Sequence, residues 1–166
     1  MSENLYAFFE SRFPADRATP LLLLAGGEAM TYAQAEAGAG RYASLLAGLG
    51  LAPGERVAVQ VEKSPEALLL YLGCLRAGLV YLPLNSAYQE GEVGYFLENA
   101  EPRAVVAQPK SMPWLRPLAE RLGIHNVFSL DEQGRGSIAD AAASADARFG
   151  TVHELWDAFL ALVGPA

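Results

Sequence analysis

Lysine is scarce in this sequence. Only Lys63 and Lys110 occur among its 166 residues, and neither lies in a glycine-rich segment. Loops that bind phosphate groups use glycine to let the backbone approach and usually lysine to supply charge, so these 166 residues contain no Walker-type loop. Basic residues are few altogether, with 12 Lys and Arg against 19 Asp and Glu and a net charge of −7. A nucleic-acid partner, which requires clustered positive charge, is therefore not expected.

Cysteine and histidine are also rare. Cys74 is the single cysteine, so no internal disulfide can form, which fits the reducing cytosol. It lies inside an apolar segment, and we expect a buried and inert thiol there. His125 and His153 stand far apart in the sequence, whereas zinc needs three or four ligands at close spacing. No metal site is predicted.

Long apolar runs and a basic N-terminal start are missing too. The apolar stretches are a few residues long, against the roughly 20 needed to cross a bilayer. The first residues, MSENLYAFFESRF, lack the form of a secretory signal. We expect a cytoplasmic protein that binds no membrane. With 52% apolar and 19% charged residues, the chain is unlike a disordered one.

The sequence does contain an alternation of short extended and helical segments. Strands are predicted at 21–25, 29–32, 56–61, 79–84, 103–107 and 126–130, and helices at 4–13, 32–49, 65–78, 90–99, 114–122 and from 137. The first two strands flank Gly26-Gly27 and form a predicted hairpin. The later strands alternate with helices, which is typical of βαβ units. We predict a three-layer α/β domain with a mostly parallel sheet, helices on both of its faces and an N-terminal hairpin.

Three stretches together resemble a known family. They are Met30-Thr31-Tyr32, residues 61–66 (VEKSPE) and residues 75–88 (LRAGLVYLPLNSAY). These stretches are similar to the N-terminal part of the AMP-dependent acyl-CoA synthetases and ligases, the adenylate-forming enzymes. Within that family they look most like malonyl-CoA synthetases, as does the turn at residues 134–137 (GRGS). We therefore predict an N-terminal subdomain over residues 1–149, followed by a divergent segment, residues 150–166.

The resemblance implies an activity for the full-length enzymes of the family. They join a carboxylic acid to ATP with Mg²⁺ and then transfer the acyl group to CoA. It also implies that their phosphate loop, ribose-binding aspartate and catalytic lysine lie on later segments without a counterpart in this chain. We expect no catalytic residue here and no cofactor for this chain alone, whereas the full-length family uses ATP, Mg and CoA.

Three hypotheses about function follow. The leading one is a truncated or stand-alone N-terminal subdomain of a malonyl-CoA-synthetase-like acyl-CoA ligase, inactive by itself. The alternative is a non-catalytic binding or assembly module that uses an exposed apolar surface and the helix predicted at the end of the chain. The third is an unrelated doubly wound domain that binds a small ligand at its strand ends, where open α/β sheets place ligands.

The candidate site residues follow two neighbouring strands. Glu62, Lys63 and Ser64 come after the strand at 56–61, and Asn85 and Tyr88 come after the strand at 79–84. All five are predicted near a cleft at the carboxyl ends of parallel strands. A structural interpretation competes and is favoured: Ser64 with Pro65 is a typical helix start, and asparagine commonly shapes turns.

The last residues form a second candidate surface. Trp156, Phe159, Leu160 and Val163 fall at i, i+3, i+4 and i+7, which predicts an amphipathic helix over residues 150–166. Such a stripe packs on its own domain or on a partner, since aromatic residues are enriched at interfaces. The partners considered are a second copy of the chain and a complementary ligase fragment.

Overall fold

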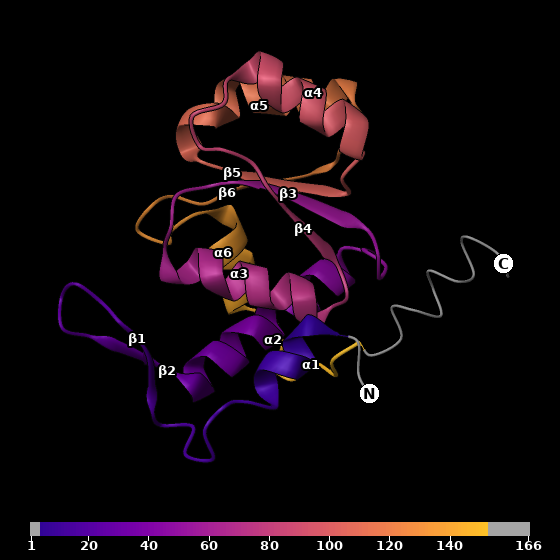
Figure 1. The fold of residues 1–166 in the computed structure, drawn as a ribbon. Coiled ribbons are helices and arrows are strands. Elements are labelled where there is room, and N and C mark those ends of the chain that lie inside the picture. Colours follow the sequence, from indigo (N-terminus) through magenta and orange to yellow (C-terminus); the bar gives the residue numbers. More distant parts are fainter. Residues whose placement is uncertain (1–3, 153–166) are drawn as a thin grey trace, which may run out of the picture.

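The computed structural model describes residues 4–152. Its helices are α1 (Leu5–Glu10), α2 (Tyr32–Gly48), α3 (Pro65–Arg76), α4 (Glu90–Ala100), α5 (Met112–Arg121) and α6 (Ser137–Ala143), with a 3-10 turn at Pro109–Ser111. Its strands are β1 (Pro20–Leu23), β2 (Ala29–Thr31), β3 (Arg56–Gln60), β4 (Val80–Pro83), β5 (Ala104–Ala107) and β6 (Asn126–Ser129). A sheet lies between two layers of helices, with α4 and α5 above it and α2, α3 and α6 below (Figure 1).

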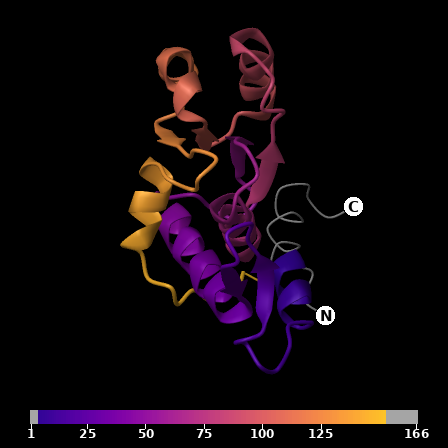
Figure 2. The same cartoon turned by 90° about the vertical axis from the view of Figure 1, so that its left-hand side faces the viewer.

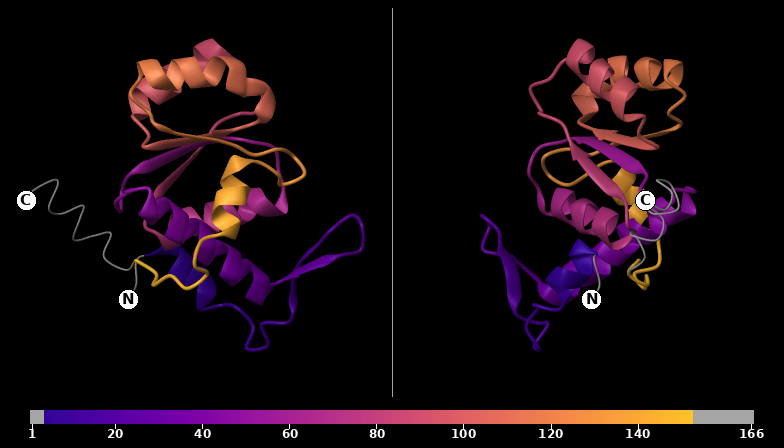
Figure 3. Two further views of the ribbon diagram at one scale, coloured as in Figure 1. Left: turned by 180° about the vertical axis from the view of Figure 1, so that it is seen from behind. Right: turned by 45° about the vertical axis from the view of Figure 1, so that its right-hand side comes forward.

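The central sheet has four parallel strands in the order β4-β3-β5-β6. In register, Val57 pairs with both Tyr81 of β4 and Ala104 of β5, and Ala107 pairs with Ser129 of β6. A separate antiparallel hairpin joins β1 and β2 and extends away from the sheet (Figure 3). The predicted fold class, three layers with a parallel sheet and an N-terminal hairpin, is confirmed.

Alternating side chains of the middle strands build two cores. Val57 and Val59 of β3 pack with α2, α3 and α6, whereas Ala58, between them, packs with α4 and α5. In β5, Val106 packs in the first of these cores and Val105 in the second. Because side chains of a strand alternate between the faces of a sheet, a strand buried on both faces is apolar throughout. Figure 2, turned by 90°, shows the two helix layers on opposite sides of the sheet.

Small residues let α2 and α3 approach closely. A Cβ atom at Gly38 would lie 2.6 Å from the Leu69 side chain, and one at Gly73 would overlap the Tyr42 side chain. The alanine- and glycine-rich composition of the α2 sequence therefore has a structural reason. The two helices together form the lower layer that carries the main core.

Caps predicted from the sequence set several boundaries. Thr31 and Gln34 form a reciprocal capping box at the start of α2. At the start of α3, the Ser64 hydroxyl accepts a hydrogen bond from the Ala67 N–H at 3.1 Å.

The turn before α6 requires glycine at position 136. Gly136 has φ 152°, and a Cβ atom there would overlap the Ser129 carbonyl.

Some predicted boundaries were wrong by one to three residues. Helix α1 begins after its Asn4 cap and ends at Glu10, short of the predicted residue 13. Helix α5 begins at Met112, two residues before the predicted start at 114, because Pro113 fits the first turn of a helix. These shifts leave the order of elements unchanged.

Within residues 4–152, no helix is long and apolar enough to cross a membrane. The predicted stripe of Trp156, Phe159, Leu160 and Val163 lies outside the described residues.

Candidate functional site

The strand order creates a switch point at the carboxyl ends of β3 and β5. From β3 the chain moves to β4 on one side, and then β5 and β6 add on the other side. Connections that leave in opposite directions open a crevice outside the strand ends, where α/β sheets bind ligands. The residues after β3, β4 and β5 are therefore the candidate site.

Gln60, the last residue of β3, connects this strand to the loop after β4. Its side chain is 2% exposed, and its Nε2 donates hydrogen bonds to the carbonyls of Asn85 at 3.0 Å and Tyr88 at 2.8 Å. The Oε1 atom of Gln60 is buried and has no hydrogen-bond partner among the described residues. One amide thus holds two points of the loop at the edge of the sheet.

Glu62 and Gln108 connect the strands on either side of the switch point. The Gln108 side chain, 8% exposed, donates from Nε2 to Glu62 Oε1 at 3.1 Å. Gln108 follows β5 directly, and its N–H also donates to the Gln60 carbonyl at 3.2 Å. A carboxylate that accepts one hydrogen bond from an amide keeps capacity for further donors, so Glu62 can still bind a polar ligand group.

The remaining predicted residues have mixed roles at this edge. Ser64 caps α3, and Lys63 is exposed. The Asn85 Oδ1 accepts a hydrogen bond from the Ala87 N–H at 2.9 Å, which is a side-chain turn. Tyr88 stacks on Phe96 with 5.5 Å between ring centroids. The five predicted residues therefore lie on two adjacent loops, and several of them shape those loops.

The sequence interpretation missed Gln60 and Gln108. Gln60 ends the valine-rich strand RVAVQ, and Gln108 directly follows the strand in RAVVAQ. A polar residue that ends a buried strand is a signal that could have identified them, since a buried amide must find partners. Their partners could not be predicted, because the contacts join segments 25 to 46 residues apart.

Reactive groups are not concentrated at this edge. The Cys74 side chain is fully buried in α3, and burial raises the pKa of its thiol far above the ordinary value. No group of three or more His, Cys, Asp or Glu side chains within residues 4–152 is placed to hold a metal ion. The edge therefore offers amide, carboxylate and hydroxyl groups and the ammonium group of Lys63, all of which can bind a polar ligand.

One partly buried hydrogen bond to a carboxylate lies beside this edge. The Tyr42 hydroxyl of α2 donates to Glu66 Oε2 in the first turn of α3 at 2.6 Å. Burial, and then the hydrogen bond to Glu66, raise the pKa of Tyr42 far above 10. The contact fixes the start of α3 against α2.

Comparisons with known proteins give the family. The AMP-binding enzyme family matches residues 10–155. The solved structure of apo MatB from Rhodopseudomonas palustris superposes with a TM-score of 0.87 at 43% identity over 93% of this chain and 30% of that chain. A long-chain-fatty-acid–CoA ligase of Mycobacterium tuberculosis is 32% identical over 118 residues, 71% of this chain and 23% of that protein.

A much longer protein aligns as well. Tyrocidine synthase 3 of Brevibacillus parabrevis is 29% identical over 124 residues, which is 74% of this chain and 2% of that protein. The chain thus spans less than a third of each of these relatives. The family match covers most of its residues. The chain belongs to the AMP-binding enzyme family, of which it carries an N-terminal part.

Proposed function

We propose that the chain is the N-terminal subdomain of a malonyl-CoA-synthetase-like acyl-CoA ligase. The observation that carries this proposal is the 43% identity to MatB over 93% of the chain, at a TM-score of 0.87. The resemblance of residues 61–66 and 75–88 to malonyl-CoA synthetases supports the same assignment. In this role the sheet edge with Glu62 and Gln108 forms one wall of the acid- and nucleotide-binding cleft.

The chain is proposed to be inactive by itself. A MatB structure contains ATP, and the family implies Mg²⁺ and CoA as further participants. The present residues fit a supporting role, because Lys63 lies in the loop between β3 and α3 and Lys110 lies in a 3-10 turn, and neither is part of a glycine loop. The Gln60 and Gln108 amides position the loops of the cleft, and other segments of a full enzyme supply the groups that act on ATP.

An exchange assay tests this proposal. The purified chain is incubated with ATP, Mg²⁺, labelled pyrophosphate and malonate, and label in ATP is measured. We expect no malonate-dependent exchange, whereas MatB in parallel exchanges label. Robust exchange by the pure chain would contradict the proposed inactivity.

A second candidate function is self-association through an apolar surface. An apolar groove of about 340 Å³ runs between α1 and α3 and is lined by Phe9, Phe13, Leu68 and Tyr71 among others. Phe8, next to the groove in sequence, is 50% exposed. Apolar patches of this kind commonly mark interfaces. Light scattering tests this candidate: a dimer supports it, and a strict monomer at high concentration contradicts it.

A further inference from the structure

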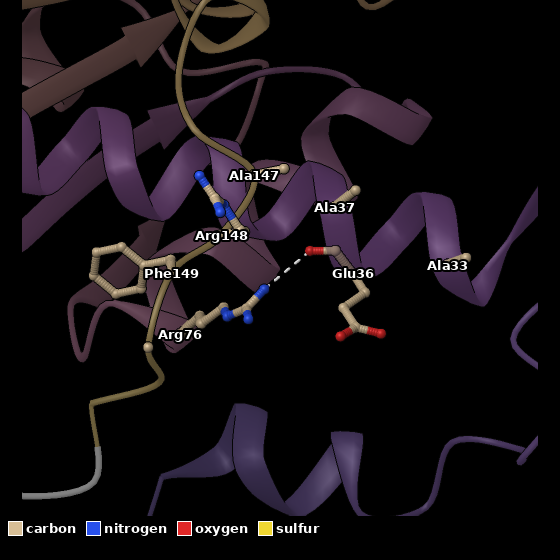
Figure 4. Close-up of a pocket in the computed structure, with 8 residues that line it drawn as sticks. Ala33, Glu36, Ala37, Arg76, Ala147, Arg148 and Phe149 are labelled. Atoms are coloured by element: carbon tan, nitrogen blue, oxygen red, sulfur yellow. Dashed lines mark hydrogen bonds between the residues drawn. The ribbon is translucent and has the colours of Figure 1, made fainter.

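A cavity of about 560 Å³ lies far from the strand-end site. It is lined by residues 33–37 of α2, by Arg76 at the end of α3 and by residues 147–150 (Figure 4). Helix α3 runs back from the carboxyl edge of the sheet, so Arg76 lies near the opposite edge, where β4 begins. The cavity is wide open to solvent, and its volume falls within the range of small-molecule sites.

The Arg76 guanidinium lies buried at this cavity. Arg76 is 9% exposed. Its Nη1 donates a hydrogen bond to the Glu36 carbonyl at 3.0 Å. Its Cζ atom lies 5.0 Å from the ring centroid of Tyr6. Within the described residues, its Nε is buried without a hydrogen-bond partner.

Within residues 4–152 Arg76 has no ion-pair partner, whereas Glu36 and Arg148, the other charged residues that line the cavity, each have one. Glu36 pairs with Arg17 at 3.9 Å. Arg148 pairs with Asp146 at 3.4 Å. No carboxylate between residues 4 and 152 forms an ion pair with Arg76. The Glu36 carbonyl and the Tyr6 ring compensate only part of the cost of burying this charge, so the position favours an anion.

The neighbouring helix makes room for this arginine. A Cβ atom at Gly40 of α2 would lie 3.2 Å from Arg76 Nη1 and would overlap the carbonyl oxygen of Ala147. Any other residue at position 40 would force the guanidinium or the segment at 147 to move. The cavity is therefore built from several elements that hold one cation in place.

We propose that this cavity binds a carboxylate group, paired with the Arg76 guanidinium. A guanidinium is a planar fork of five N–H donors that matches a carboxylate. Nη1 contributes one donor to Glu36, and the fork retains others. The carboxylate comes either from a free small acid or from an acidic side chain of this chain beyond Val152.

The second source is within reach by covalent geometry. The Val152 N–H donates to the Arg76 carbonyl at 3.0 Å. Glu154 follows two residues later, so its Cα lies at most about 7 Å from that of Val152. Asp157 is the next acidic residue. The experiment must therefore separate a free acid from these two side chains.

Succinate is the probe, titrated into the isotopically labelled full chain at constant ionic strength while amide resonances are recorded. We expect saturable shifts at Gly40 and residues 147–150, and at least about tenfold weaker binding in Arg76→Gln, in line with the loss of a charge-assisted pair. The matched control is Arg121→Gln, an exposed arginine of α5 paired with Glu90, which should bind succinate as the parent chain does.

The double variant Glu154→Gln, Asp157→Asn tests whether the bound carboxylate comes from a free acid or from these two side chains. If these side chains occupy the cavity, the double variant binds succinate more tightly than the parent chain; if the ligand is a free acid, both bind equally. Arg76→Lys replaces Arg76→Gln should the latter fail to fold, and we expect weaker binding because lysine lacks the fork. Absence of saturable shifts in both the parent and the double variant, or equal affinity in the Arg76 variants, would overturn the proposal.

Discussion

At the scale of single residues, polar side chains at the strand ends hold loops together. Gln60 holds the loop after β4 through two carbonyls, and Gln108 reaches across to Glu62. The caps at Thr31 and Ser64 were predictable, since the cap and its N–H partner are three residues apart. The amide contacts were not, because they depend on which strands become neighbours.

Replacement of Gln60 by leucine tests its role in the loop. Gln60→Leu keeps a similar volume but removes the donor for the Asn85 and Tyr88 carbonyls, so we expect a loss of about 1–3 kcal/mol in the free energy of unfolding. Urea denaturation monitored by circular dichroism measures it. Gln133→Leu, in an exposed turn, is the control and should change stability by no more than about 0.5 kcal/mol. Equal effects of both changes would refute the role.

Buried tyrosines predict a dependence of stability on alkaline pH. Burial raises the pKa of Tyr6 and of Tyr81 to about 12 from an ordinary value of 10.0, and burial and Glu66 raise that of Tyr42 further. The folded state therefore keeps protons that the unfolded chain releases, so stability is retained below pH 10 and lost as pH rises from 10 towards 12.

The variant Tyr42→Phe tests the contribution of the Tyr42 hydroxyl to this pH dependence. Each retained proton contributes a slope of up to about 1.4 kcal/mol per pH unit, so we expect the variant to lose stability less steeply above pH 10. At neutral pH it should be less stable by about 1–2 kcal/mol, because the hydrogen bond to Glu66 is gone. Urea unfolding at pH 7, 10 and 11 gives both values; an unchanged alkaline slope would contradict the assignment of Tyr42.

At the scale of elements, the close approach of α2 and α3 depends on glycine. A Cβ atom at Gly73 would overlap the Tyr42 Cβ and crowd the α2 backbone, whereas one at Gly38 would meet only the end of the flexible Leu69 side chain. The sequence predicted both helices and their small residues, but not which glycine lies at the contact. That assignment requires the rotation of each helix about its axis, which is set by packing against the sheet.

Two glycine-to-alanine changes distinguish the effect of the close α2–α3 contact from the effect of intrinsic helix propensity. Gly73→Ala should lower the free energy of unfolding by about 1–3 kcal/mol, because its Cβ would overlap Tyr42. Gly94→Ala in α4 is the matched control, since its Cβ would lie 3.7 Å from Leu118; we expect a gain of up to about 1 kcal/mol from helix propensity. Thermal and urea denaturation measure both. A gain in both variants would show that α2 and α3 pack less closely than described.

At the scale of the whole molecule, most of the fold was predictable and the site only in part. Valine-rich strands between capped helices fixed the order of elements and the three layers, because the signals are local and repeat along the chain. The strand order β4-β3-β5-β6, which creates the switch point and brings Gln108 to Glu62, is a product of long-range pairing. The buried charge of Arg76 had no signal in sequence, since arginine at a helix end is usually exposed.

We propose that this chain is the N-terminal subdomain of a malonate-activating ligase, and a chimera with MatB tests this at the scale of the whole molecule. The most direct measurement replaces the matching 30% of MatB by residues 1–152 of this chain and records malonate-dependent pyrophosphate exchange. The MatB remainder alone is the control. The account predicts a chimera whose rate lies within about tenfold of that of MatB, equivalent to about 1.4 kcal/mol of transition-state stabilisation. A folded, monodisperse chimera that shows no more exchange than the remainder alone would contradict it.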